Sequence, residues 1–179
     1  MTGQVPDEWL AAAARVLGEG GLAGFTVDRV AREAGVSRVT FHRRGIRRRD
    51  LIEGLLAGAA LDLRSSMLPV LASRESSPAR LRRAFEVLCE VSERHDAVLA
   101  AVYDVRDPGP EAGVTSGFEF IDPFERLLLD AGEPPGSAAE RAEVMVNAVI
   151  WTYLHLRRAH RREAARARAA VVALVLGGP

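Results

Sequence analysis

The sequence predicts an all-α protein of some nine helices. Apolar residues recur at helical spacing along almost the whole chain, and no segment alternates apolar and polar residues as a half-buried strand would. A hydrophobic content of 48% with 27% charged residues is that of a folded globular protein. At 179 residues the chain has room for one domain, or for a small domain fused to a larger one.

The N-terminal elements have the form of a helix-turn-helix. A first helix is expected over Asp7–Gly18, followed by a glycine-rich turn that reaches Gly24. Thr26 is placed to cap a short second helix that ends at Gly35, and Ser37 is placed to cap a third. Two short helices joined by three residues that include a glycine are the sequence form of this motif.

The following helices join this small unit to a larger remainder without a linker. A fourth helix is expected to begin near Arg48 and to run towards Met67. Ser77 is expected to cap the next helix, and Ser137 with Glu140 forms a capping box for a long one. That long helix reaches residue 162. Further helices are expected over residues 96–105 and 118–131, with a loop at 107–117 and a last helix that ends at 177.

The last two expected helices carry more apolar surface than one packed face requires. The helix over 137–162 is apolar on two faces, and the final helix is apolar all round. We expect a partner subunit to cover the surplus, most simply in a C₂ dimer. The alternative is a central helix that is buried within one chain.

The composition indicates the cellular compartment of the protein and the kinds of site that it lacks. The single cysteine, Cys89, excludes an internal disulfide and a thiolate metal cage, and it agrees with a reducing cytoplasm. No signal peptide is apparent, and no apolar run reaches the ~18 residues of a membrane span. The protein is therefore expected to be cytoplasmic, without a membrane partner. We expect no metal and no cofactor.

Arginines gather in one short segment of a neutral chain. Lys+Arg 24 balance Asp+Glu 24, yet no acidic residue lies between Arg38 and Arg49. Every basic residue is arginine, which suits phosphate but also follows from a genome rich in G and C. On a helical wheel Arg38, Val39, His42 and Arg43 share a face that Phe41 avoids. A short helix with such a basic face suits the DNA major groove, whereas a solvated charged face is the alternative.

The run from AAAARVL through GLAGFTVDRVAREAGVSRVTFHRR to RDLI is similar to that of TetR-type transcriptional regulators. The resemblance implies a helix-turn-helix DNA-binding domain over residues 1–50. It also implies a helical effector-binding and dimerisation domain over residues 51–179. By this resemblance the chain is a non-enzymatic, ligand-responsive regulator that binds a near-palindromic operator as a homodimer and is expected to act as a repressor.

The resemblance also implies the residues that contact double-stranded DNA. Three positions would read bases or nearby backbone, namely Arg38, Val39 and His42. Positions that would hold phosphate are Thr26, Thr40, Arg43, Arg44 and Arg48. Gly45 and Ile46 depart from the family pattern, because an aromatic residue followed by proline or glycine is usual there.

Two further sites are expected in the larger domain. A pocket for a small hydrophobic effector would be lined by Met67, Phe85, Cys89, Tyr103, Phe118, Phe120, Trp151 and His155, for which ordinary core is the alternative. The dimer interface would contain Met145, Val149, Thr152, Leu156, Val171, Leu174 and Val175.

The glycine-rich segment and the histidines give little indication of a cofactor or metal site. The GEGGLAG segment matches a dinucleotide fingerprint loosely, but a helix rather than a strand precedes it. His155 and His160 are five residues apart with no carboxylate to complete a metal set. The competing function is a helical small-molecule-binding or enzymatic bundle without affinity for duplex DNA, and a ligand-dependent activator shares the contacts of a repressor.

Overall fold

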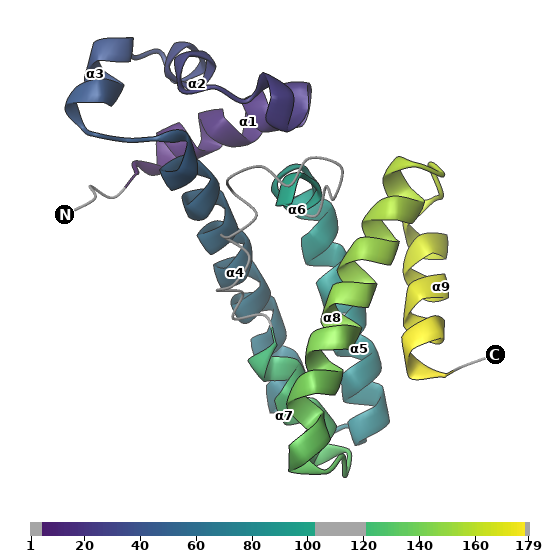
Figure 1. The fold of residues 1–179 in the computed structure, drawn as a ribbon. Helices are drawn as coiled ribbons and strands as arrows, with labels where there is room; N and C mark the ends of the chain where they lie inside the picture. Colours follow the sequence, from purple (N-terminus) through teal and green to yellow (C-terminus); the bar gives the residue numbers. More distant parts are fainter. Residues whose placement is uncertain (1–4, 103–120, 178–179) are drawn as a thin grey trace. The chain divides into compact units, whose positions relative to one another are not determined.

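A computed structural model describes residues 5–102 and 121–177, and every regular element in these ranges is an α-helix. The nine helices of the described residues confirm the all-α class (Figure 1). The chain forms two compact units: of the described residues, the first holds 5–59 and 97–102, and the second holds 60–96 and 121–177. The functional division predicted between residues 50 and 51 stays a prediction.

The first unit contains α1 (Asp7–Gly24), α2 (Val27–Glu33), α3 (Arg38–Arg43), the beginning of α4 (Arg48–Ala72) and most of α6 (Asp96–Val102). Its core centres on Trp9 of α1 and Phe41 of α3, whose rings stack with centroids 4.1 Å apart. Both side chains are buried, as are Ile46 and Leu51. The aromatic pair therefore fixes α3 against α1.

The glycine-rich end of α1 differs from the expected turn. The helix continues past Gly18 to Gly24 and is broken at Gly21, where φ is 57° and ψ is −167°. Arg29 of α2 explains the neighbouring glycines, because its Nη1 donates to the Gly24 carbonyl at 3.0 Å. A Cβ atom at Gly20 or Gly24 would lie 2.7 Å from that nitrogen. These glycines allow close approach of an arginine, and no dinucleotide site is formed.

The second unit is a helical bundle. It contains the end of α4 with α5 (Ser77–Arg94), α7 (Asp122–Asp130), α8 (Pro135–Arg158) and α9 (Ala164–Leu176). Helix α8 packs on α5, α7 and α9, and Figure 1 shows α8 and α9 side by side. Both apolar faces expected for α8 are largely buried in this way. Helix α8 is thus a central helix of the second unit, and the partner subunit stays a prediction.

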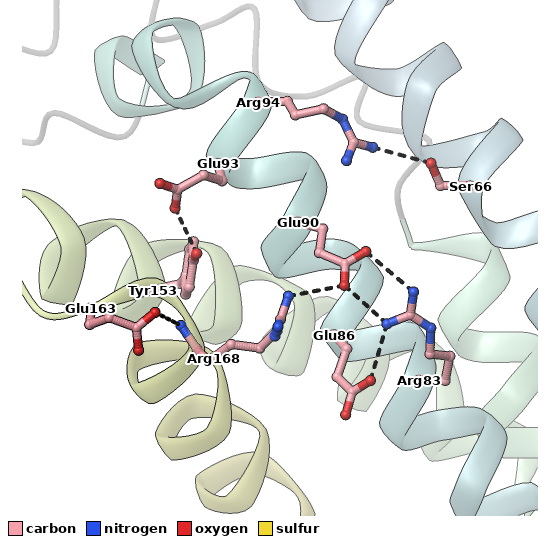
Figure 2. A network of polar contacts seen from close by, with 10 residues as sticks. Ser66, Arg83, Glu86, Glu90, Glu93, Arg94, Tyr153, Glu163 and Arg168 are labelled. Carbon is pink, nitrogen blue, oxygen red and sulfur yellow. Dashed lines mark hydrogen bonds and ion pairs between the residues drawn. The ribbon is translucent and has the colours of Figure 1, made fainter.

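Polar contacts tie α5 to α8 and α9. Tyr153 donates to Glu93 at 2.6 Å, and Arg157 pairs with the same carboxylate (Figure 2 draws the tyrosine contact). The bond from Arg157 holds the pKa of Glu93 below its ordinary value. On the next turn of α5, Glu90 accepts from Arg83 and, at 3.0 Å, from Arg168 of α9. These contacts fasten the last two helices to the bundle.

Two of the expected helix starts are wrong. Ser76, not Ser77, precedes α5, and the Ser77 hydroxyl donates instead to the Asp130 carbonyl at 2.9 Å. Helix α8 begins at Pro135, so Ser137 lies inside its first turn and does not cap it. Proline at the start of each helix removes a backbone N–H that needs no partner there, which favours the earlier start at Pro135.

Helix α4 contradicts the expectation that no apolar stretch of the chain is long enough to span a membrane. Within the described residues it is long and apolar enough, by length and composition only, to cross a membrane. Core helices of soluble proteins meet the same criterion. The buried side chains of α4 include Leu51, Ile52, Leu56, Leu63 and Met67.

Candidate nucleic-acid interface

The ends of α2 and α3 are set by local hydrogen bonds that the sequence predicted. Thr26 Oγ1 accepts from the backbone N–H of Arg29 at 3.3 Å, and Ser37 Oγ accepts from that of Thr40 at 3.2 Å. Gly35, with φ of 68°, ends α2, and the N–H of Val36 donates to the Ala31 carbonyl at 3.0 Å. Both caps and the left-handed glycine are thus confirmed.

The turn into α4 is built on Gly45 and Ile46. Gly45 has φ of 66° and donates to the His42 carbonyl at 3.0 Å, while the N–H of Ile46 donates to the Phe41 carbonyl at 3.4 Å. This pair of bonds is a Schellman motif, in which an apolar residue after the glycine packs towards the helix. Ile46 is buried, so it supplies the apolar anchor of a turn that lacks the usual aromatic residue.

The outer face of α3 is exposed as the helical wheel predicted. Arg38, Val39, His42 and Arg43 are exposed, whereas Phe41 is fully buried on the opposite side. Val39 is 65% exposed and is the one large exposed apolar side chain of α3. The face therefore offers cationic donors around one apolar contact.

The arginines of the segment differ in what they touch. Arg44 lies over the Trp9 ring, with its guanidinium carbon 5.1 Å from the centroid. Arg49 pairs with Glu53 at 2.6 Å. Nη2 of Arg48 donates to the Leu22 carbonyl at 2.9 Å, so this side chain is turned towards α1.

Among the described residues, two arginines of the segment contact neither a carboxylate nor an aromatic ring. Arg43 and Arg47 are exposed, and within the described part of the chain neither guanidinium has an acidic partner. Arg47 was not among the expected DNA contacts. Its position in the turn before α4, within a run of arginines, was the available signal.

Arg38 has a partner from outside the segment. Its Nε lies 3.1 Å from Oδ1 of Asp28 on α2. The sequence showed no acidic residue between Arg38 and Arg49, but it could not show that α2 brings one to Arg38 through the helix-turn-helix. Asp28 was therefore missed.

Five of the eight expected effector-pocket residues lie in the described part of the chain, and these five differ in burial. Met67, Phe85 and Cys89 are fully buried in the second unit. Trp151 and His155 instead lie on the exposed side of α8, and the three other expected residues, Tyr103, Phe118 and Phe120, lie outside the described residues. Burial raises the pKa of the Cys89 thiol to about 12, as expected of a core cysteine.

The expected dimer-interface residues differ in exposure, and the interface stays a prediction. Met145, Val149 and Val171 are buried within the second unit. Thr152, Leu156 and Val175 are half-buried, and Leu174 is 68% exposed. The exposed apolar side chains of α8 are Val144 and Trp151, seven residues apart and hence on one face.

Comparisons with known proteins agree with this architecture. Residues 10–45 match the family model described as bacterial regulatory proteins, tetR family. A TetR-like transcriptional regulator from Rhodococcus sp. RHA1 is 18% identical, with 94% of this chain and 92% of that chain covered and a TM-score of 0.69. No curated protein matches the sequence significantly.

Two further solved structures have the same fold. The TetR family regulator PfmR from Thermus thermophilus is 18% identical, with 95% of this chain and 97% of that chain covered and a TM-score of 0.67. A TetR variant from Acinetobacter baumannii AYE, in complex with minocycline, is 16% identical, with coverages of 98% and 94% and a TM-score of 0.70. The chain therefore has a TetR-family N-terminal domain and the fold of a TetR-family transcriptional regulator.

Proposed function

We propose that the protein is a homodimeric, ligand-responsive repressor that binds a near-palindromic operator through α3. The observation that carries this proposal is the face of α3, where exposed Arg38, Val39, His42 and Arg43 lie opposite a buried Phe41. A short helix held by its caps and by a stacked aromatic pair can enter a major groove without deforming. The family match to this segment supports DNA as the partner.

The contacts divide between bases and phosphates. Arg38 and His42 carry donors suited to base edges, and Val39 suits the methyl group of thymine. Thr26, Thr40, Arg43 and Arg44 position the protein on the backbone, and Arg47 joins them. Arg48 has one terminal nitrogen on the Leu22 carbonyl, so we assign it to holding the start of α4 rather than to direct phosphate contact.

Dimerisation is proposed through the outer face of α8 and α9. Val144 and Trp151 on α8 and Leu174 on α9 are large apolar side chains that the second unit leaves exposed. They replace the buried Met145, Val149 and Val171 in the proposed interface. A C₂ dimer would present two recognition helices to half-sites spaced by ~10 base pairs or a multiple.

A response to a ligand is proposed only from the similarity to a structural relative that binds one. The structural relative from Acinetobacter baumannii is in complex with minocycline, and Met67 and Phe85, two of the proposed pocket residues, are apolar and buried here. We propose that the ligand acts on helix α4 and so alters the spacing of the recognition helices. Unchanged operator affinity across a panel of hydrophobic ligands would contradict this part of the proposal.

The decisive test is selection of duplexes from a random pool by the full-length protein, followed by salt titration of the enriched sequences. We expect an enriched near-palindrome. Three phosphate-contacting arginines in each protomer give a log–log salt slope of about −5. The double variant R43A/R47A should flatten this slope by about 3.6 in a dimer.

The matched control is R74A/R82A, which also removes two exposed arginines that have no acidic partner among the described residues. Both lie in the second unit, outside the helix-turn-helix. The control should leave the slope unchanged. Equal flattening by both double variants, or no enriched sequence with the native protein, would instead favour a ligand-binding or enzymatic bundle without specific DNA affinity.

A further inference from the structure

An acidic side chain lies at the face that is proposed to meet DNA. Oδ1 of Asp28 lies 3.1 Å from Nε of Arg38, and the two side chains are 51% and 69% exposed. A carboxylate here opposes attraction to phosphate and offsets the charge of a recognition arginine. A carboxylate at this position is therefore expected to have a role that offsets its weakening of binding to DNA of any sequence.

The atoms used by the pair indicate that role. Arginine recognises guanine through two parallel hydrogen bonds to O6 and N7, and the terminal Nη1 and Nη2 atoms can make both. The carboxylate of Asp28 comes closest to Arg38 at Nε, and the terminal nitrogens are the atoms that would meet a base. The guanidinium is planar, and a carboxylate paired with it beside Nε therefore favours the orientations in which the other two nitrogens point away from Asp28.

Other ion pairs of this unit join residues of α1, α2 and α4. Arg15 with Glu33 and Arg49 with Glu53 also pair through Nε, both at 2.6 Å, and Arg29 pairs with Glu19 at 3.4 Å. None of these pairs involves a residue of α3. Among these ion pairs of the described residues, the one made by Asp28 restrains a side chain on the proposed recognition face.

We infer that Asp28 is a positioning residue that aims Arg38 at one guanine in each half-site of the operator. The inference rests on the proposed function. Asp28 lowers the affinity for DNA of any sequence, because it offsets one positive charge, and raises the preference for guanine, because it removes wrong orientations of Arg38. Specificity is a difference between two affinities, so it can rise while both fall.

The test uses the enriched duplex and a second duplex in which the guanine assigned to Arg38 is replaced by adenine. That guanine is identified as the position at which R38A loses its preference. The native protein should prefer guanine about 5- to 100-fold, the range of one good bidentate contact. D28A should lower this ratio roughly twofold to fivefold, and D28N, which keeps the shape and an acceptor oxygen, should lower it less.

Two comparisons distinguish the positioning of Arg38 by Asp28 from a general effect of the Asp28 charge on DNA affinity. R38A/D28A should show the same base preference as R38A alone, because Asp28 acts only through Arg38. E33Q is the matched control, since it also removes one exposed negative charge from α2 but leaves Arg38 untouched. It should strengthen binding to both duplexes alike and leave their ratio unchanged.

Each outcome decides between the proposals. If D28A strengthens binding to both duplexes equally, as E33Q does, Asp28 only repels phosphate and the inference is wrong, while the proposed function stands. The inference also fails if R38A alters the preference at no guanine. If the native protein enriches no sequence, the proposed function fails first. Far-UV circular dichroism of D28A and D28N checks that α2 remains folded.

Discussion

Gly45 and Gly58 provide an internal comparison of backbone strain in the first unit. A Cβ atom added at either glycine meets nothing within 4 Å, so the same substitution to alanine creates no clash at either position. The two differ in conformation, because Gly45 has φ of 66° whereas Gly58 lies within helix α4. Any difference between G45A and G58A therefore reports the backbone.

The expected changes have opposite signs. Left-handed backbone costs an L-residue about 1–2 kcal/mol, partly offset by the lower entropy of the unfolded alanine chain, so G45A should destabilise the unit by about 1 kcal/mol. Alanine within a helix is favoured over glycine by about 0.5–1 kcal/mol, so G58A should stabilise it. The two variants should then differ by about 1.5–2 kcal/mol.

Urea unfolding of the full-length protein measures this difference. Trp9 is buried in the first unit, so its emission reports that unit, and W151F removes the only other tryptophan from the signal. G45A should also weaken binding to the enriched duplex, because Gly45 ends α3, whereas G58A should not. Equal stability of the two variants, or a more stable G45A, would refute the assignment of strain to the α3–α4 turn.

The remaining predictions concern the second unit. E93Q should destabilise the protein at neutral pH. Because the pKa of Glu93 is lowered in the folded state, the stability that this carboxylate confers is present above its unfolded-state pKa and is lost as the pH falls through its folded-state pKa. The urea unfolding curves of the native protein and of E93Q should therefore converge in acid. Cys89 should resist alkylation at pH 8 until denaturant is added, as measured by mass spectrometry; rapid labelling of the native protein would contradict its burial. V144E/W151E should sediment as a monomer, whereas L61E, at a comparably exposed leucine on α4, should leave the native association state unchanged.

The sequence predicted best those features that depend on neighbours in the chain. Thr26, Ser37 and Gly35 were assigned correctly because a cap or a left-handed glycine is defined within a few residues. Phe41 was placed inside and Arg38 outside because one turn of a short helix separates apolar from polar side chains. The same local signals supported the family resemblance, which the match over residues 10–45 bears out.

The sequence failed where the outcome depends on packing between distant elements. The apolar stripe containing Met145 and Val149 was assigned to a partner subunit, but α8 packs on α5, α7 and α9, and these two side chains are buried within the unit. Trp151 was assigned to a pocket, although it shares the exposed face of Val144. Periodicity shows that a helix has an apolar face, but not which neighbour covers it.

The concentration of arginine is not by itself what distinguishes the candidate DNA site. Arg161 and Arg162, at the turn between α8 and α9, are also exposed and have no acidic partner within the described residues. In α3 the arginines stand on a helix with a capped N-terminus, a Schellman C-terminus and a buried Phe41 stacked on Trp9.

That support turns a charged segment into a surface of defined shape, which base recognition requires and phosphate attraction does not. The two kinds of binding can therefore be separated by substitution. Loss of charge at Arg43 should weaken binding to every duplex alike, whereas loss of the Phe41 side chain should abolish the preference for one sequence while leaving every arginine in place. If F41A remains folded and still selects the same operator, the rigid placement of α3 is not the source of specificity.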